Sequence, residues 1–268
     1  MLRAHQSTLR GILNGIDETF WNPEGDPHLV QHYRTQGAHS LEQLEQIRRG
    51  KAANRKHLNA HLGLREGKGP LVACITRLVL QKGPHLIKHA LLRTIEKGGQ
   101  FVLLGATHPG EIAEEFSRLK AQLADHPDVA IVLDSDEALA HLIYASADMQ
   151  LIPSLFEPCG LTQMIALRYG TIPIARATGG LVDTVFDVDT SAQPPHKRNG
   201  FTFEFPDEIG VNWALDRALQ YWTKTPKQWL ELMRQGMQMD CSWTHSAAQY
   251  EALYATVCTQ QPIKTSPF

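Results

Sequence analysis

The sequence lacks the features that mark several large classes of protein. None of its apolar runs approaches the roughly 20 residues that a membrane-spanning helix needs. Residues 1–10 hold no apolar segment of the signal-peptide kind, so we expect no signal peptide on this chain. An excess of one charge is also missing, since 26 basic residues stand against 28 acidic ones. This balance argues against nucleic acid or a membrane as the main partner.

Cysteine is scarce, and the usual glycine-rich nucleotide signatures are absent. The sequence has four scattered cysteines and no Cys-x-x-Cys pair, which indicates free thiols in a reducing compartment and not a disulfide framework or a zinc site. Neither G-x-G-x-x-G nor G-x-x-x-x-G-K-[ST] occurs, so a nicotinamide dehydrogenase and a P-loop protein both lack support.

From residue 71 onward, short apolar runs alternate with helical stretches. The expected strands are residues 71–76, 101–105, 129–133, 149–153, 171–175 and, more weakly, 200–203. The expected helices are residues 85–96, 111–124, 137–145, 161–169, 180–186, 208–222, 226–239 and 245–257. Because the strand runs are continuously apolar, they are typical of strands covered on both faces. The pattern predicts an α/β fold, a Rossmann-like parallel sheet with helices on both faces.

By composition the chain divides into a leading segment, residues 1–65, a main domain, residues 66–240, and a C-terminal helix with its tail, residues 241–268. The leading segment contains a polar stretch at 41–62 whose apolar residues recur with the period of a helix, and we expect a surface helix there. Residues 187–199 are polar and contain two prolines, which predicts a surface loop.

Ligands of open α/β sheets bind beyond the carboxyl ends of the strands, so we expect the binding residues in the loops there. Arg77 and Lys82 follow the first strand, and both could converge on one anion, such as a pyrophosphate, beside the next helix. The alternative is a pair of solvated loop cations. Glu157 follows the fourth strand and could bind a ligand, or could be only a helix N-terminal charge worth about 0.3–1 kcal/mol.

Two further features support a ligand at this edge. Gly160 allows close approach of a backbone, and Thr162 begins a helix whose free N–H groups could hold a phosphate or hydroxyl. A third glycine-rich turn, Gly179-Gly180, follows the fifth strand. Three such turns on one edge predict a cradle for a phosphorylated ligand.

Metal binding has weaker support. Two Asp-x-Asp motifs, at 134–136 and 187–189, match the pattern of some sugar transferases, but neither stands in a larger acidic cluster. Three histidine pairs have the i,i+4 spacing of helix-borne metal ligands, without an evident third ligand. These pairs are His28/His32, His57/His61 and His85/His89. We expect no metal site.

Several segments resemble the starch synthases and bacterial-type glycogen synthases that use ADP-glucose, GT-B glycosyltransferases of family 5. The main one is FEPCGLTQMIALRYGTIPIARATGGLVDTVFD at 156–187, joined by TRLVLQKGPHLI at 76–87 and GILNGIDETFWNP at 11–23. The resemblance runs from about Gly11 to about Tyr254 and is greatest to plant and algal soluble starch synthases.

This resemblance implies the C-terminal half of a GT-B enzyme, because GILNGID marks the family's crossover from an N-terminal domain and the Lys-x-Gly-Gly-Leu motif of that domain is absent. Residues 66–240 would bind the nucleotide sugar, and the missing N-terminal GT-B domain would supply much of the α-glucan acceptor site. The whole enzyme would be a retaining glucosyltransferase that elongates α-1,4-glucan and releases ADP. We expect little activity from this chain alone, in a plastid or else in a bacterial cytoplasm.

The resemblance also implies roles for the loop residues that follow the first and fourth strands. Arg77 and Lys82 would neutralise the diphosphate and stabilise the departing ADP. Glu157 would contact the glucose hydroxyls as the acidic catalytic residue. With two cations and helix dipoles available for the charge, neither a metal nor another cofactor is expected.

Further substrate-binding roles follow for five other residues. The backbone at Cys159, Gly160 and Leu161, together with Thr162, would hold the sugar and the distal phosphate. Asn14 would reach the donor from the crossover segment.

Two positions depart from related enzymes. Ile165 stands where some GT-B enzymes have a second glutamate, and Ser135 stands where related bacterial enzymes have an aromatic residue that stacks on adenine. Two other functions therefore stay open, a GT-B transferase that uses UDP-glucose and a non-catalytic glucan-binding or scaffold protein derived from a synthase.

Overall fold

One six-stranded parallel sheet organises the chain. The computed structural model describes residues 9–35, 40–67 and 69–260. The strands lie in the order β3-β2-β1-β4-β5-β6, and every neighbouring pair is parallel. Their bounds are β1 Leu71–Arg77, β2 Gln100–Ala106, β3 Val129–Val132, β4 Met149–Ile152, β5 Ile172–Arg176 and β6 Phe201–Phe203. The predicted α/β parallel-sheet fold is confirmed, with each strand end within one residue of its expected place.

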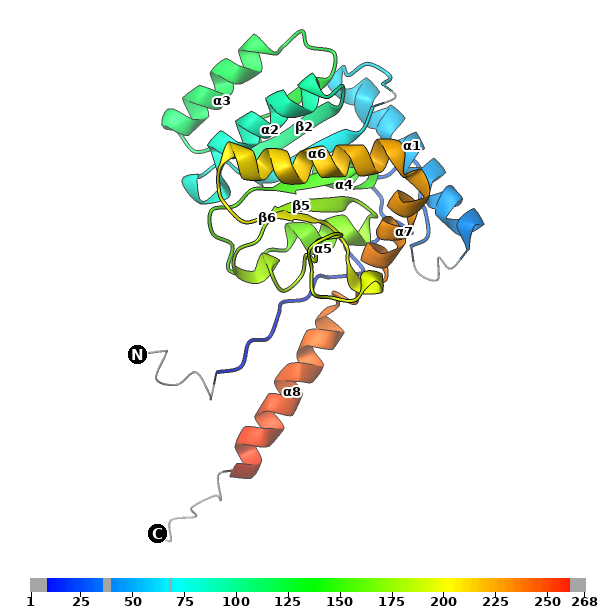
Figure 1. Ribbon diagram of the computed structural model, residues 1–268, viewed down its shortest axis with the longest axis vertical. Coiled ribbons are helices and arrows are strands. Elements are labelled where there is room, and N and C mark those ends of the chain that lie inside the picture. The colour runs from blue at the N-terminus through cyan, green and yellow to red at the C-terminus, as the bar shows by residue number, and fades with distance from the viewer. Residues whose placement is uncertain (1–8, 36–39, 68, 261–268) are drawn as a thin grey trace.

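Helices cover both faces of this sheet (Figure 1). Their bounds are α1 Leu41–Leu62, α2 Pro84–Glu96, α3 Glu111–Gln122, α4 Glu137–Ser146, α5 Thr162–Arg168, α6 Glu208–Lys224, α7 Pro226–Met237 and α8 Trp243–Gln260. The chain runs outward from β1 to β3 and returns to β4 beside β1, so right-handed crossovers place α2 and α4 on opposite faces. α6 packs on α2, and α1 packs on α4. Within the described ranges, no helix has the length and apolar character needed to cross a membrane.

The reversal of strand order between β1 and β4 brings two loops together at the carboxyl edge. Gly83, in the loop after β1, has a φ of +67°, and a Cβ atom there would lie 2.4 Å from the carbonyl oxygen of Pro153 after β4. The backbone N–H of Leu155 donates to the carbonyl of Gln81 at 2.8 Å. The two loops are therefore in direct backbone contact.

The helix expected over 180–186 is wrong. The structure has only a three-residue 3-10 turn, Gly179–Leu181, at that place. The N–H of Gly180 donates to the carbonyl of Glu157 at 2.9 Å, so this backbone docks on the loop after β4 and does not continue as an α-helix. The surface loop expected over 187–199 holds only in part, because Asp187 and Asn199 at its two ends are buried.

The surface helix expected at 41–62 is present as α1, but its burial is greater than expected. Leu44, Ile47 and Leu58 belong to the same buried cluster as the strand residues. Lys51 is also buried, and its ammonium group donates to the carbonyls of Tyr144 and Tyr169 at 3.2 and 3.0 Å. α1 is therefore part of the core. The domain boundaries proposed at 65/66 and 240/241 stay predictions.

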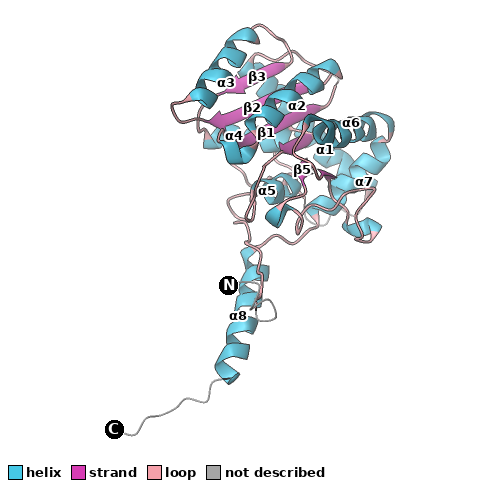
Figure 2. Cartoon of the chain, turned by 60° about the vertical axis from the view of Figure 1, so that its left-hand side comes forward, coloured by secondary structure: helices cyan, strands magenta, loops and turns pink. Residues whose placement is uncertain are grey.

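The last helix, α8, does not pack along the sheet as the other helices do. α8 projects from the body of the domain in both views (Figures 1 and 2). Trp243, Tyr254 and Val257 along it are exposed. At its base, the N–H of Ile16 donates to the carbonyl of Cys241 at 2.8 Å, so the leading segment and the start of α8 run side by side.

Substitution of Gly83 tests the contact between the two loops. Gly83→Ala should lower the free energy of unfolding by about 2–3 kcal/mol, because strain at positive φ adds to the clash with the Pro153 carbonyl. Gly63→Ala is a matched control, since Gly63 has a φ of +70° but open space around its Cβ position. It should lose only about 1 kcal/mol in urea unfolding. Equal losses in the two variants would contradict the close contact.

Lys51 predicts a specific dependence of stability on pH. Burial lowers the pKa of Lys51 to about 7 from 10.5, so between these pH values the unfolded chain binds more protons at this site than the folded chain. Stability should therefore rise with pH across this window, by up to about 1.4 kcal/mol per pH unit from this group. Chemical unfolding at pH 7 to 10 should show that Lys51→Met loses this slope and that Lys227→Met, at an exposed position, keeps it.

Candidate functional site

A cleft of about 400 Å³ opens at the carboxyl edge of the sheet, between β1, β2 and the start of α4. Three of the predicted binding residues, Arg77, Lys82 and Thr162, line it. Ser135 lies on the α4 side. Apolar side chains from the strands and α4 also line it, namely Ile75, Leu104, Ala106 and Ala140. Three acidic side chains, Asp134, Asp136 and Glu137, line it at the start of α4. The cleft thus joins a cationic end, at Arg77 and Lys82, to an apolar wall and an acidic side at the start of α4. This arrangement suits a ligand that has an anionic part, an apolar part and hydroxyl groups that carboxylates can accept from.

Glu157 is not among the residues that line the cleft, but it pairs with Lys82, which is. The Lys82 ammonium donates to Glu157 Oε2, and the Ser154 hydroxyl donates to the same oxygen at 3.0 Å. Only 7% of Glu157 is exposed, so the carboxylate is held in one orientation by two donors and by burial. Arg77 is exposed, and its guanidinium has no ion-pair partner in the described part of the chain. The cleft is therefore lined by Arg77, which has no ion-pair partner in the described residues, and by Lys82, which is paired with Glu157.

The loop that carries Glu157 rests on the glycine-rich turn after β5. Gly179 has a φ of +51°, and a Cβ atom there would lie 2.0 Å from the Glu157 carbonyl oxygen. A Cβ atom on Gly180 would lie 2.5 Å from the carbonyl oxygen of Cys159. Both glycines are required because two backbones are in contact here. The third turn therefore supports the backbone of the Glu157 loop.

The next residues lead into α5. Gly160 has a φ of +75°, and its carbonyl accepts from Gln163 Nε2 at 2.9 Å. Cys159 and Thr162 are half-buried, whereas Leu161 is exposed. Their backbone is thus placed beside Glu157, as expected from their order in the chain, and their binding roles stay predictions.

Asn14 lies apart from this cleft. It lines another cavity, of about 540 Å³, between the leading segment and the start of α8. Pro158, from the far side of the Glu157 loop, borders the same cavity. The structure therefore does not bring Asn14 into one cavity with Arg77 and Lys82, and its predicted contact with the donor stays untested.

Trp21 is a lining residue of the cleft to which the sequence reasoning assigned no role. Its ring stacks on the buried ring of His141 from α4, with centroids 4.1 Å apart and an interplanar angle of 14°. His141 Nδ1 lies 2.7 Å from Asp26 Oδ2, and the Tyr169 hydroxyl donates to that oxygen at 2.5 Å. The segment GILNGIDETFWNP contained Trp21, but nothing local to it indicates a partner on α4.

Asp26 holds a charge inside the protein. Its side chain is fully buried, which by itself disfavours ionisation. The hydrogen bonds from His141 and Tyr169 outweigh that effect and lower the pKa of Asp26 below its ordinary value. The same neighbourhood raises the pKa of Tyr169, mainly through burial. A charged, hydrogen-bonded Asp26 therefore fixes the position of the His141 ring against Trp21.

Arg176, at the end of β5, is a second residue that sequence reasoning left without a role. Its guanidinium donates to the carbonyl of Leu155 at 2.5 Å and to the carbonyl of Glu204 at 3.0 Å. It thereby links the loop after β4 to the loop after β6.

The two Asp-x-Asp motifs have structural partners. Asp136 caps α4 by accepting from the N–H of Leu139 at 2.8 Å. Asp187 and Asp189 both pair with Arg217, at 2.8 and 2.6 Å. The carboxylates of Asp136, Asp187 and Asp189 therefore stabilise the fold through a helix cap and ion pairs.

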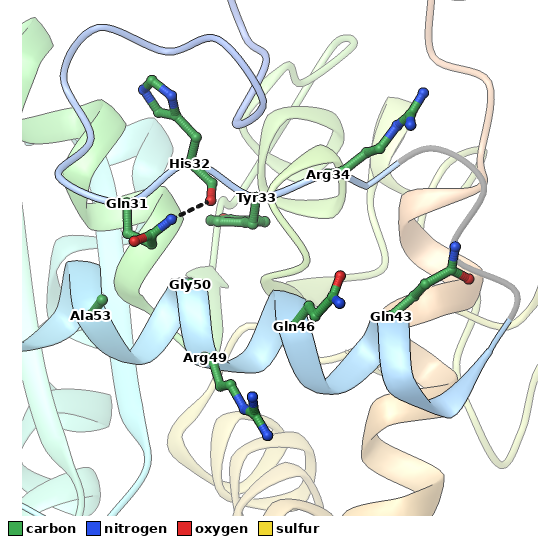
Figure 3. Close-up of a pocket in the computed structure, with 9 residues that line it drawn as sticks. All are labelled: Gln31, His32, Tyr33, Arg34, Gln43, Gln46, Arg49, Gly50 and Ala53. Carbon is green, nitrogen blue, oxygen red and sulfur yellow. Dashed lines mark hydrogen bonds between the residues drawn. The ribbon is translucent and has the colours of Figure 1, made fainter.

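A polar cavity of about 550 Å³ lies elsewhere, between residues 31–34 and α1. Figure 3 shows Gln43 and Gln46 pointing toward residues 31–34, whereas Arg49 points away. None of the predicted site residues lines this cavity. We therefore place the candidate site in the cleft at the carboxyl edge.

The chain is similar to known proteins over most of its length. Residues 60–235 match the profile described as Glycosyl transferases group 1. The chain is 48% identical over 256 residues to a glycogen synthase from Protochlamydia amoebophila, covering 96% of this chain and 51% of that protein. It is 49% identical to a probable chloroplastic/amyloplastic starch synthase 4 from Arabidopsis thaliana, covering 94% of this chain and 24% of that protein.

A solved structure is similar over the same extent. The catalytic domain of starch synthase IV from Arabidopsis thaliana, bound to ADP and acarbose, superposes with a TM-score of 0.88 at 48% identity. The match covers 97% of this chain and 51% of that one. The chain thus spans about half the length of that domain and of the Protochlamydia relative.

The buried Asp26 charge predicts a large effect on stability. Asp26→Asn should lower the free energy of unfolding by about 3–5 kcal/mol at neutral pH, because it removes a buried carboxylate that is held by hydrogen bonds to both His141 and Tyr169. The difference from the wild type should shrink below about pH 4, where protonation of Asp26 removes the same charge. Asp125→Asn, at an exposed position, should change stability by less than about 0.5 kcal/mol. Urea unfolding at pH 3 to 7 measures both variants, and a pH-independent difference would contradict this account.

Proposed function

This chain belongs to the group 1 glycosyl transferases, and we propose that it is the donor-binding half of a retaining glucosyltransferase. The proposed donor is ADP-glucose, and the proposed acceptor is the non-reducing end of an α-1,4-glucan. The observation that carries this proposal is that Arg77 and Lys82 both line the cleft and that Lys82 also pairs with Glu157. Relatives that are glycogen and starch synthases, one of them bound to ADP, support the choice of an adenine donor.

The cleft offers each part of a nucleotide sugar a suitable environment. The diphosphate would lie between Arg77 and Lys82, whose charges stabilise an anionic leaving group. The glucose would lie at Glu157, whose carboxylate is fixed by Lys82 and Ser154 and can accept from sugar hydroxyls. The nucleoside would lie along the apolar wall formed by the ends of β1 and β2. Binding would replace solvent around Arg77 with a phosphate oxygen.

The departure of ADP would be faster if positive side chains already lay beside its phosphates. As ADP leaves, negative charge grows on its terminal phosphate, and Arg77 and Lys82 would meet it without reorganisation. Lys82 would share its protons between Glu157 and the phosphate, since an ammonium group has three donors. We propose that these cations make a metal ion unnecessary.

We further propose that an N-terminal GT-B domain completes the enzyme. The chain spans about half of its bacterial relative. Large apolar side chains stand exposed at the carboxyl edge, and they are Leu80, Phe156, Phe205 and Ile209. Exposed apolar groups on one edge are typical of a surface that another domain covers. The projecting α8, with Trp243 and Tyr254 exposed, offers a second surface for the same domain.

The proposed compartment is a plastid, with a bacterial cytoplasm as the alternative. The relatives include both a protein named chloroplastic/amyloplastic and bacterial glycogen synthases, which supports either origin.

Calorimetric titration of this chain with ADP, ADP-glucose and UDP-glucose tests the proposal. The adenine compounds should bind more tightly than UDP-glucose. Arg77→Ala should weaken ADP binding by about 10- to 100-fold, the range expected for loss of a charged hydrogen bond. Lys120→Ala, an exposed cation on α3, is the control and should bind ADP like the wild type.

Two results would contradict the proposal. Preference for UDP-glucose would favour a different GT-B transferase. Unchanged ADP affinity in Arg77→Ala would place the nucleotide elsewhere and favour a binding or scaffold protein.

A further inference from the structure

A further cavity, of about 360 Å³, lies at the opposite edge of the sheet from the cleft. Asp148, which lines it, directly precedes β4, and Gly170 stands two residues before β5. The cavity is therefore at the amino ends of the strands, whereas the cleft is at their carboxyl ends. α1 and α7 border it, and they lie near one another in Figures 1 and 2.

The two walls of this cavity differ in chemistry. The wall from α6 and α7 is apolar and aromatic, and its residues are Trp222, Pro226, Trp229, Leu230 and Met233. The wall from α1 is polar and charged, with Glu45, Arg48, Lys51 and Arg55. A ligand with one apolar face and one hydroxylated edge would match both walls. The volume lies within the roughly 300–1,000 Å³ of small-molecule sites, which are mostly apolar with a few placed polar groups.

The deep cations are already committed to the fold. Lys51 donates to Thr171 Oγ1 at 2.9 Å and to two backbone carbonyls. Arg55 donates to the carbonyl of Gly69 and to Gln100 Oε1, both at 2.7 Å. Lys51 thereby uses three donors, and Arg55 also pairs with Asp148 at 3.2 Å, although the Nε–H of Arg55 has no partner in the described structure. The cavity is therefore better suited to a neutral ligand than to an anion.

Polar groups that a neutral ligand could use are found at the mouth. Glu45 and Arg48 form an ion pair of 2.8 Å and remain 40% and 61% exposed, so both retain hydrogen-bonding capacity. Planar carboxylate and guanidinium groups each recognise two adjacent polar atoms. On the inner side, the hydroxyl oxygen of Ser146 is buried and has no hydrogen-bond partner in the described structure. An unpaired buried hydroxyl in a cavity wall is a group that a ligand could satisfy after a small side-chain rotation.

We infer that this cavity binds a glucosyl unit of an α-glucan, as an anchoring site separate from the donor cleft. A pyranose ring has apolar C–H faces, which would pack on Trp222, and an edge of hydroxyls, which would face Glu45 and Arg48. The choice of glucan among neutral sugars rests on the proposed function. Because a glucan is a polymer, an anchor on the far edge would hold many chain ends near the enzyme and raise their effective concentration.

Binding of maltoheptaose to this chain, followed by calorimetry, tests the site. Trp222→Ala should weaken maltoheptaose binding at least tenfold, because the stacking surface is lost. Trp213→Ala is the matched control, since Trp213 lies on the same helix, is 58% exposed and does not line the cavity. It should leave maltoheptaose affinity unchanged, and ADP affinity should be unchanged in both variants.

A second variant covers the case in which Trp222→Ala fails to fold. Glu45→Ala combined with Arg48→Ala changes a half-buried and an exposed side chain, neither of them in the core, and should weaken maltoheptaose binding several-fold. Unchanged affinity in this double variant and in Trp222→Ala would overturn the site. So would a wild-type chain that binds ADP but not maltoheptaose, and that result would leave the proposed function standing. Failure of ADP binding alone, with glucan binding still dependent on Trp222, would overturn the proposed function and keep the anchoring site.

Discussion

The contact between the loops after β1 and β4 is the constraint on which the candidate site depends. β1 and β4 are neighbours only because the chain returns to the middle of the sheet after β3, and this places Lys82 beside a carboxylate 75 positions later. Gly83 has no Cβ atom, so the backbone can pass against the Pro153 carbonyl. A bulkier residue there would separate the two loops, and with them the cation from Glu157. The chemistry of the site is thus a consequence of strand order.

Other residues hold the Lys82–Glu157 pair and the walls of the cleft in place. The Gly179-Gly180 turn lies directly against the backbone of the Glu157 loop, and Arg176 links that loop to the end of β6. On the other side of the cleft, the stack of Trp21 on His141 depends on the buried charge of Asp26. None of these supporting groups needs to touch a substrate to matter. They hold charged groups still, so that little reorganisation is required when a charged ligand arrives.

The two edges of the sheet are suited to different ligands. The carboxyl edge has a free arginine and a paired lysine, which suit an anion, and it carries exposed apolar residues that suit a covering domain. At the amino edge the two buried cations, Lys51 and Arg55, make internal hydrogen bonds, and the cavity presents an aromatic wall and a polar mouth that includes Arg48. Separation of the edges by the length of the strands would let a polymer be held at one edge while a nucleotide binds at the other.

The amino-acid sequence alone is enough to predict the strands, most of the helices, the parallel sheet and the loops that hold Arg77, Lys82 and Glu157. Those features follow from local patterns, since continuous apolar runs and helical periodicity are written in neighbouring residues. Only the tertiary structure decided that Lys82 pairs with Glu157, that Asn14 lines a different cavity, that 180–186 docks as a turn and that α1 is part of the core. It also placed Trp21 on His141 and Trp222 opposite α1. These contacts join residues far apart in the chain, and their partners are set by strand order and packing, which no local pattern records.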